Sequence, residues 1–108
     1  MRSPVSLSGR ARFSTVFTEG RRARNDGISV WILPRDEGYP THLGLAVSAR
    51  AGGAVSRNRL RRRVRALVRE ASIPADVVVS AGREAMELSF QEVGLSLNRA
   101  IATVGGSR

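Results

Sequence analysis

Hydrophobic side chains between Ser56 and Pro74 recur at the spacing of an α-helix. On a helical wheel they fill an arc of roughly 100°, wide enough to pack one side of the helix against a core. Ser56 is the expected N-cap, because its hydroxyl can accept a hydrogen bond from a free amide of the first turn. We therefore predict a helix from Ser56 that is broken at Pro74, with an apolar stripe made of Leu60, Val64, Leu67, Val68 and Ala71.

Three apolar runs predict β-strands. Ile28–Leu33 alternates, which places Trp31 on the face opposite the isoleucines of that strand. Leu43–Ser48 is the second strand, and the turn-rich connection between the two predicts an antiparallel pair. Asp76–Ser80 contains three consecutive valines, which suits a central strand covered on both faces or one parallel to a neighbour. The order strand, helix, strand over Leu43–Ser80 predicts a βαβ unit.

A short helix is expected near the N-terminus, over Gly9–Glu19, with Ser8 as its N-cap and an end near Gly20. Its apolar residues stand at i, i+3 and i+4, and they are Phe13, Val16 and Phe17. After it we expect a basic turn, closed by residues 25–27 and containing Arg21, Arg22 and Arg24.

The last helix is expected to begin at Ser89, because Ser89 and Glu92 have the spacing of a capping box, and to end at the glycines 105–106. Together these elements predict a small α/β (α+β) sandwich. It is one domain over residues 7–104, with a mixed sheet of three to four strands, an arginine-rich helix in the βαβ unit and a helix at each end. Residues 1–6 form a loose or extended arm, and 105–108 form a tail.

The charge is concentrated in the first two-thirds of the chain. The 108 residues hold 18 arginines, no lysine and 9 acids. Residues 1–69 carry 15 arginines and 4 acids, a net charge of +11, whereas residues 70–108 carry 3 arginines and 5 acids, a net charge of −2. This distribution predicts an anion-binding surface on the first part and a scaffold in the last.

Seven arginines and no acid lie on the predicted helix between residues 56 and 69. Like-charge pairs four residues apart each destabilise a helix by roughly a few tenths of a kcal/mol, so repulsion among these arginines destabilises the predicted helix. A solvated basic face is the ordinary interpretation of a charge run. The density and the missing acids favour nucleic-acid contact instead, through a row made of Arg57, Arg61, Arg65 and Arg69.

The composition also indicates where in the cell the protein is expected. The chain has no cysteine, which excludes disulfides and thiolate metal sites and fits the cytoplasm. No apolar run approaches about 18 residues, so no transmembrane helix is expected, and the first residues lack the apolar core of a signal peptide. We expect a cytoplasmic protein without a membrane partner.

No side chains have the pattern of a catalytic or metal site. His42 is the one histidine and has no serine or carboxylate pattern beside it, so an ordinary edge or loop residue is expected. Asp36, Glu37 and Asp76 lack metal-ligand spacing. Gly52-Gly53 before a helix is a weak phosphate-loop pattern, better interpreted as a backbone turn. We expect no catalytic residue and no metal ligand in the protein.

The three aromatic side chains Phe13, Phe17 and Trp31 have two interpretations. Their spacing fits core residues. Spacing alone favours that interpretation. The functional interpretation is a platform for single-stranded nucleic acid, where each stacked base contributes about 1–3 kcal/mol. The second interpretation gains from the alternation of Ile28–Leu33, because that strand has a core face without Trp31.

Three segments of the sequence are similar to motifs of a known family. AVSRNRLRRRVRALVRE (Ala54–Glu70) resembles the signature of the bacterial ribonuclease P protein subunit, centred on Arg-Asn-Arg. LGLAVSAR (Leu43–Arg50) resembles the strand before that signature, and RFSTVFTEG (Arg12–Gly20) resembles the family's first helix with its paired aromatics. The resemblance covers roughly residues 7–104. Trp31 and Gly53 depart from the family, which often has a smaller aromatic and an Asn there.

The resemblance implies a fold and an activity that spacing does not show. It implies a left-handed βαβ crossover, a further short strand, and membership of the ribonuclease P holoenzyme, a hydrolase that removes the 5′ leader of precursor tRNA. The RNA subunit, with Mg²⁺ that it holds, carries the chemistry. Phe13, Phe17 and Trp31 would line the leader cleft. The catalytic RNA would dock on Arg50, Arg57, Asn58, Arg59, Arg61, Arg62 and Arg65.

Three other functions are alternatives to the one that the resemblance implies. A DNA-binding regulator would place the arginine helix in a major groove, but strands flank that helix where a helix-turn-helix partner is needed. A basic ribosomal protein has the same composition. A free-standing nuclease would need a cluster of carboxylates or histidines, which the sequence lacks.

Overall fold

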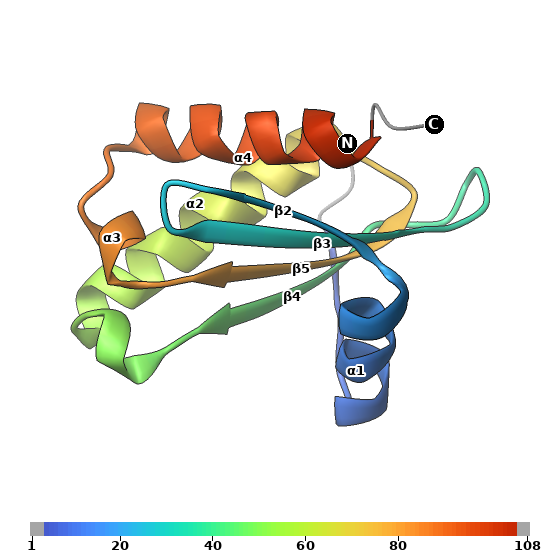
Figure 1. The fold of residues 1–108 in the computed structure, drawn as a ribbon, viewed down its shortest axis with the longest axis horizontal. Coiled ribbons are helices and arrows are strands. Elements are labelled where there is room, and N and C mark those ends of the chain that lie inside the picture. The colour runs from blue at the N-terminus through green and yellow to red at the C-terminus, as the bar shows by residue number, and fades with distance from the viewer. Residues whose placement is uncertain (1–3, 106–108) are drawn as a thin grey trace.

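Residues 4–105 are described by the computed structural model, and they form one five-stranded sheet with helices on both faces (Figure 1). The strands lie in the order β1-β4-β5-β3-β2. Their bounds are β1 Val5–Ser6, β2 Arg21–Asn25, β3 Ile28–Pro34, β4 His42–Val47 and β5 Ala75–Ala81. The helices are α1 Arg10–Glu19, α2 Ala54–Ala71, α3 Arg83–Met86 and α4 Phe90–Gly105, with a 3₁₀ turn, η1, at Ala49–Ala51.

β5 is the central strand, as its valines predict. It pairs in parallel with β4 and antiparallel with β3, so β4, α2 and β5 form the predicted βαβ unit. The prediction that β3 and β4 pair with each other is wrong, because β5 lies between them, with Val78 beside Trp31 on one side and Gly44 on the other. Residues 77–79 are at most 1% exposed, and such a strand is buried only with neighbours at both edges and layers on both faces.

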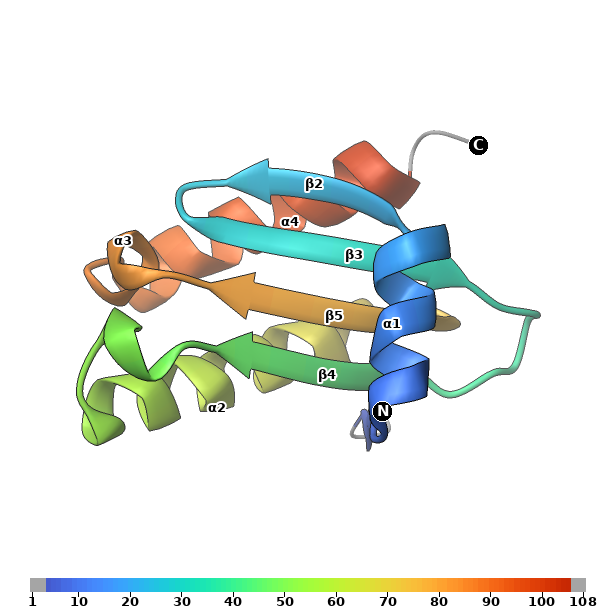
Figure 2. The same cartoon turned by 60° about the horizontal axis from the view of Figure 1, so that its bottom comes forward.

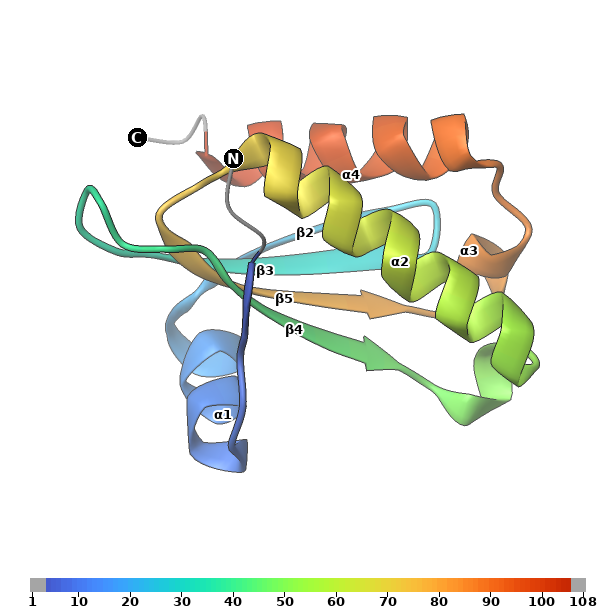
Figure 3. The ribbon, with the colours of Figure 1, turned by 180° about the vertical axis from the view of Figure 1, so that it is seen from behind.

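The βαβ crossover is left-handed, as the family resemblance implies. In Figure 3, α2 lies in front of the sheet, the arrows of β4 and β5 point to the right, and the chain steps upward from β4 to β5. A right-handed unit in this orientation would step downward, which is the sense that almost all such connections adopt.

β2 is a strand where a basic turn was expected. Arg21–Asn25 pairs with β3 over five residues, and the hairpin closes at Asp26 and Gly27. Both residues have positive φ, 53° and 79°, as a two-residue hairpin turn requires. The arginine-rich sequence of β2 does not have the apolar pattern of a strand. β2 is an edge strand, where exposed charged side chains are tolerated and oppose pairing with other chains.

The helix starts differ from the sequence predictions at two places. α2 begins at Ala54 with Gly53 as its N-cap, three residues before the predicted N-cap Ser56, and its first two residues, Ala54 and Val55, are exposed. α1 begins at Arg10 with Gly9, and not Ser8, at its N-cap. The short helix α3 was not predicted.

The start of α4 is as predicted. The Ser89 amide donates to the Glu92 carboxylate at 2.8 Å, and the Glu92 amide donates to the Ser89 hydroxyl at 3.2 Å. Both bonds of the capping box are therefore present at the first turn of the last helix.

Two apolar layers hold the sheet. The larger layer lies between the sheet and the pair α2 and α4, and includes Val64, Val79 and Leu97. The smaller layer lies on the opposite face, under α1, where Leu7, Val16 and Val78 are buried (Figure 2). Trp31 belongs to the α1 face, as the alternation of its strand predicts.

The N-terminal arm is fixed over part of its length. Val5 and Ser6 are extended, as expected, but they are not loose, because they form β1 in parallel with β4. The Val5 amide donates to the Thr41 carbonyl at 2.8 Å, and Leu7 donates to Leu43 at 2.9 Å. Residues 1–3 of the arm and 106–108 of the tail lie outside the described residues.

Gly20, between α1 and β2, lies close against backbone atoms, which gives a first prediction. A Cβ there would lie 2.5 Å from the Val16 carbonyl oxygen and 3.2 Å from that of Ile32, both backbone atoms. We expect Gly20→Ala to lower the free energy of unfolding by about 1–3 kcal/mol, since the backbone must shift to admit the methyl group. Chemical denaturation measures this.

The matched control is Gly82→Ala. No atom lies within 4 Å of a Cβ at Gly82, and its φ of −104° is open to alanine. Equal effects of the two substitutions would contradict the close packing assigned to Gly20.

Candidate nucleic-acid interface

The outer surface of α2 is an unneutralised row of arginines. α2 buries Leu60, Val64 and Val68 against the sheet, which turns the row of Arg57, Arg61, Arg65 and Arg69 away from the core. Arg65 and Arg69 are exposed, while Arg57 and Arg61 are half-buried. Within residues 4–105 no arginine of α2 forms an ion pair. The positive charge of the row therefore has no internal counterpart.

The polar contacts of this surface leave most of its donors free. Arg61 donates to the Asn58 side chain at 3.3 Å. The Nε of Arg57 is buried and has no hydrogen-bond partner among the described residues. Asn58 and Arg62 are exposed in the same sector. The predicted RNA-binding residues of this sector are thus brought together.

Two arginines of α2 face the other way, as their helical positions predict. Arg59 is exposed and lines a hollow with Arg63, next to α3 and the start of α4. Arg63 donates to the Leu88 carbonyl at 3.4 Å, and its guanidinium lies 5.8 Å from the centre of the Phe90 ring. Arg59 thus stands apart from the other predicted RNA-binding residues. Arg50 is exposed in η1.

The three predicted aromatics come together on the opposite face of the sheet. Phe13 and Phe17 of α1 have ring centres 6.3 Å apart, and Phe17 meets the Trp31 ring edge-on at 4.8 Å. Phe13 lies directly over Gly44, where a Cβ would be 2.4 Å from the ring. Val16 supplies the buried contact of α1, so Phe17 remains 42% exposed and Phe13 and Trp31 half-buried. We call these three side chains the aromatic row.

A buried carboxylate supports α1 from behind the aromatic row. Asp76 is 1% exposed and accepts hydrogen bonds from the Tyr39 hydroxyl at 2.6 Å, from Arg35 Nη2 at 2.8 Å and from Arg12 Nη2 at 3.3 Å. Arg12 belongs to α1, and Arg35 and Tyr39 belong to the connection between β3 and β4. Asp76 therefore ties three separate segments to the start of β5.

The surroundings of Asp76 keep it ionised. Burial by itself would raise its pKa. Hydrogen bonds from Tyr39 and Arg35, together with the charges of Arg35 and Arg12, outweigh burial and hold the pKa below the ordinary value of 3.8. Sequence reasoning missed this role because the partners are distant along the chain; the available signal was an acid at the head of an apolar strand.

The remaining candidates take structural places. His42 lies in β4, with Nδ1 2.9 Å from the Pro40 carbonyl and 3.9 Å from Asp76. Gly53 is the N-cap of α2, and Asp36 and Glu37 are exposed in a turn. Among residues 4–105 there is no group of three or more histidines and acids that could hold a metal ion, and none of the helices described is long and apolar enough to cross a membrane.

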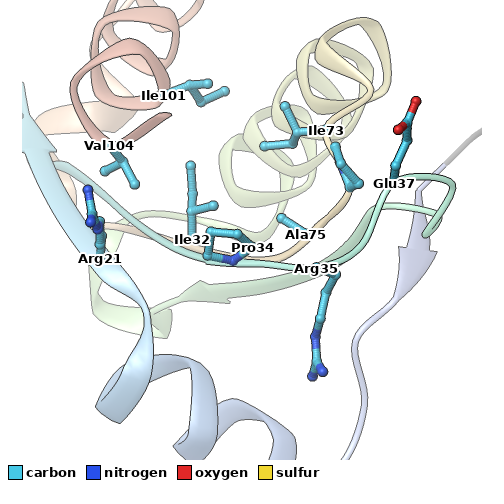
Figure 4. Close-up of a pocket in the computed structure, with 10 residues that line it drawn as sticks. Arg21, Ile32, Pro34, Arg35, Glu37, Ile73, Ala75, Ile101 and Val104 are labelled. Atoms are coloured by element: carbon cyan, nitrogen blue, oxygen red, sulfur yellow. The ribbon is translucent and has the colours of Figure 1, made fainter. Parts of the chain in front are cut away.

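A pocket of about 570 Å³ lies away from both surfaces (Figure 4). The side chain of Ile73, just after α2, and those of Ile101 and Val104, near the end of α4, converge on it, and Ile32 forms part of its floor. Arg35 lines its rim and points away from the apolar side chains. None of the residues predicted to bind RNA lines this pocket.

Comparison with known proteins identifies the family. A sequence model described as Ribonuclease P matches residues 1–105. A ribonuclease P protein component from Shouchella clausii is 38% identical over 101 residues, which cover 90% of this chain and 83% of that protein. A second, from Thermobifida fusca, is 37% identical, with 88% and 72% covered.

The fold agrees with solved structures of the same family. The RNase P protein of Staphylococcus aureus superposes with a TM-score of 0.80 at 25% identity, covering 92% of this chain and 95% of that one. The protein of Thermotoga maritima gives 0.74 at 26% identity, with 91% and 94% covered. The left-handed βαβ fold with its arginine helix is thus that of a ribonucleoprotein subunit. The chain belongs to the ribonuclease P protein family, so the resemblance seen in the sequence is confirmed.

The Asp76 cluster gives a second prediction. Asp76→Asn removes the negative charge that Arg12 and Arg35 share. We expect it to lower the free energy of unfolding at pH 7 by about 1–3 kcal/mol. This is less than the loss of a fully buried ion pair would cause, because both arginine side chains are over 40% exposed. Because the native pKa is lowered, this stability is complete above the unfolded pKa and is lost as pH falls through the native one.

Thermal unfolding of the unaltered protein and of Asp76→Asn, from pH 7 to pH 2, measures the effect. The difference in stability between the two proteins should begin to shrink below about pH 4 and vanish below the native pKa of Asp76. Asp36→Asn is the matched control, since Asp36 is exposed in the same connection. A constant difference down to the lowest pH would contradict the role assigned to the charge of Asp76.

Proposed function

We propose that this chain is the protein subunit of a bacterial ribonuclease P. It binds the catalytic RNA through α2 and holds the 5′ leader of precursor tRNA on the aromatic row. The RNA and the Mg²⁺ that it binds hydrolyse the phosphodiester bond that frees the leader, in the cytoplasm. The observation that carries the proposal is the arginine row of α2, which no acid within residues 4–105 neutralises, on a member of this family.

The charge of α2 supports a folded RNA partner. Helical repeats of arginine repel one another until a polyanion supplies the counter-charge. About six arginine–phosphate contacts would make log affinity fall with log salt by somewhat less than one unit per contact. The predicted contact residues are Arg50, Arg57, Asn58, Arg59, Arg61, Arg62 and Arg65.

The aromatic row supports a single-stranded ligand. Phe17 is exposed beside a half-buried Trp31, which leaves ring surface for bases to stack on. The row lies on the face of the sheet opposite α2, so the catalytic RNA and the leader would not compete for one surface. The role of the protein is then to neutralise phosphates and to position the substrate, while the cleavage chemistry stays with the RNA.

The α2 surface gives a third prediction. Charge reversal at Arg61→Glu with Arg65→Glu should weaken binding of the ribonuclease P RNA at least tenfold, because it removes two counter-charges and adds two repulsions. Filter binding measures affinity. Cleavage of precursor tRNA by the RNA at physiological Mg²⁺, with and without protein, measures function.

Arg99→Glu is the control, because Arg99 is an exposed arginine of α4 on another surface. Equal binding by the double variant and the unaltered chain, or no stimulation of cleavage by the unaltered chain, would refute the proposal. Co-sedimentation with ribosomal subunits, or preference for duplex DNA, would point to the rival basic ribosomal or DNA-binding functions.

The aromatic row gives a fourth prediction. Phe17→Ala should weaken binding of precursor tRNA to the holoenzyme by about fivefold or more, the loss expected for one stacked base, and leave binding of mature tRNA unchanged. Phe90→Ala is a matched control, since Phe90 is 48% exposed and lies on α4. A loss for both tRNAs alike, or a loss with Phe90→Ala, would contradict leader binding by the row.

A further inference from the structure

The aromatic row continues into an arginine of the edge strand. On the α1 face, Trp31 of β3 stands opposite Arg22 of β2, and the Arg22 guanidinium lies 5.2 Å from the centre of the Trp31 ring. With the ring spacings of 6.3 Å and 4.8 Å inside the row, a line of neighbouring groups runs from Phe13 to Arg22. It follows α1 across the sheet from β4, where Phe13 covers Gly44, to β2.

A second arginine extends this line along the edge. Arg24 is two residues further along β2 and pairs across the strands with Ser29, so strand alternation puts its Cβ on the same face as that of Arg22. It stands at the edge of the sheet, where it also lines a hollow of about 510 Å³ beside α4. Both arginines are exposed. The neighbouring acids Glu19 and Asp26 are exposed too, and neither forms an ion pair with them.

Two other arginines near the α1 face are bound differently. Arg12 and Arg35 are both held by Asp76 at 3.3 Å and 2.8 Å, so their charge serves the fold. Among the described residues no carboxylate pairs with Arg22 or Arg24, so their positive charge remains available to an anion.

The fold places these free arginines at the end of the line farthest from α2. α2 packs against β4, whereas α4 packs against β2 and β3 (Figure 2). An RNA that docks on α2 therefore approaches the sheet from the β4 side. A single-stranded RNA segment lying along α1 would pass Phe13 first, then Phe17 and Trp31. It would reach Arg22 and Arg24 last.

We propose that Arg22 and Arg24 bind phosphates of leader nucleotides upstream of those that stack on the aromatic row, so that the edge strand sets how long a leader the protein can hold. The inference rests on the proposed function of the row. From β4 to β2 is three strand spacings, about 14 Å, which is roughly four nucleotides at about 3.4 Å each. Nucleotides beyond that length would be the ones that the two arginines contact.

An alternative role for arginines on β2 is protection of the sheet edge from pairing with another chain. That role needs charge of either sign, so glutamate would serve as well as arginine. Phosphate binding needs positive charge. Reversal of charge at Arg24 therefore separates the two explanations.

The experiment measures binding of precursor tRNA to the assembled holoenzyme, with leaders of about two and about ten nucleotides, for Arg22→Ser, Arg24→Ser and Arg24→Glu. With the long leader we expect each serine variant to bind about three- to tenfold more weakly, the glutamate variant more weakly still, and the salt slope to fall by roughly 0.7 per arginine removed. With the short leader all variants should bind like the unaltered protein.

Arg99→Ser is the matched control, because Arg99 is an exposed arginine of α4, which covers the face of the sheet opposite the aromatic row. Equal weakening by Arg99→Ser and Arg24→Ser would mean a general charge effect and would overturn the proposal. So would equal losses for both leaders, or full binding by Arg24→Glu. Failure of Phe17→Ala to affect any leader would instead refute the function of the aromatic row, which distinguishes the two failures.

Discussion

Burial of β5 on both faces is the constraint on which the rest of the structure depends. Val77 and Val79 are covered by α2 and α4, while Val78 lies under α1. A strand without a polar side needs a layer on each face, and the chain provides one from its arginine-rich helix and another from its first helix. Two surfaces of different chemistry therefore lie on opposite faces of the sheet, one cationic and the other aromatic.

The arginines divide into two groups by their partners. Arg12 and Arg35 are held by the buried carboxylate of Asp76, and their charge stabilises the junction of α1, β5 and the β3–β4 connection. The arginines of α2 have no acid partner among the described residues. Free positive charge of this density favours a polyanionic partner, so the electrostatics and the family support the same proposal of an RNA partner.

Local patterns predicted the elements better than they predicted the pairings. The stripe of Leu60, Val64 and Val68 located α2, and Ser89 with Glu92 located the start of α4, because helix periodicity and capping are properties of neighbouring residues. The pairing of β3 with β4 was wrong because strand order depends on which strand is buried most. β2 was missed because an edge strand needs no apolar face.

The candidate site shows the same division. The sequence alone determined which residues carry the positive charge and the aromatic rings, since charge and ring chemistry belong to side chains, and the predicted row of Arg57, Arg61, Arg65 and Arg69 lies on one helix, α2. Only the tertiary structure decided that Arg22 stacks on Trp31, that Phe13 covers Gly44 and that Asp76 anchors Arg12. Each of these contacts joins segments far apart along the chain, and their distances follow from strand order and register, which no local pattern encodes.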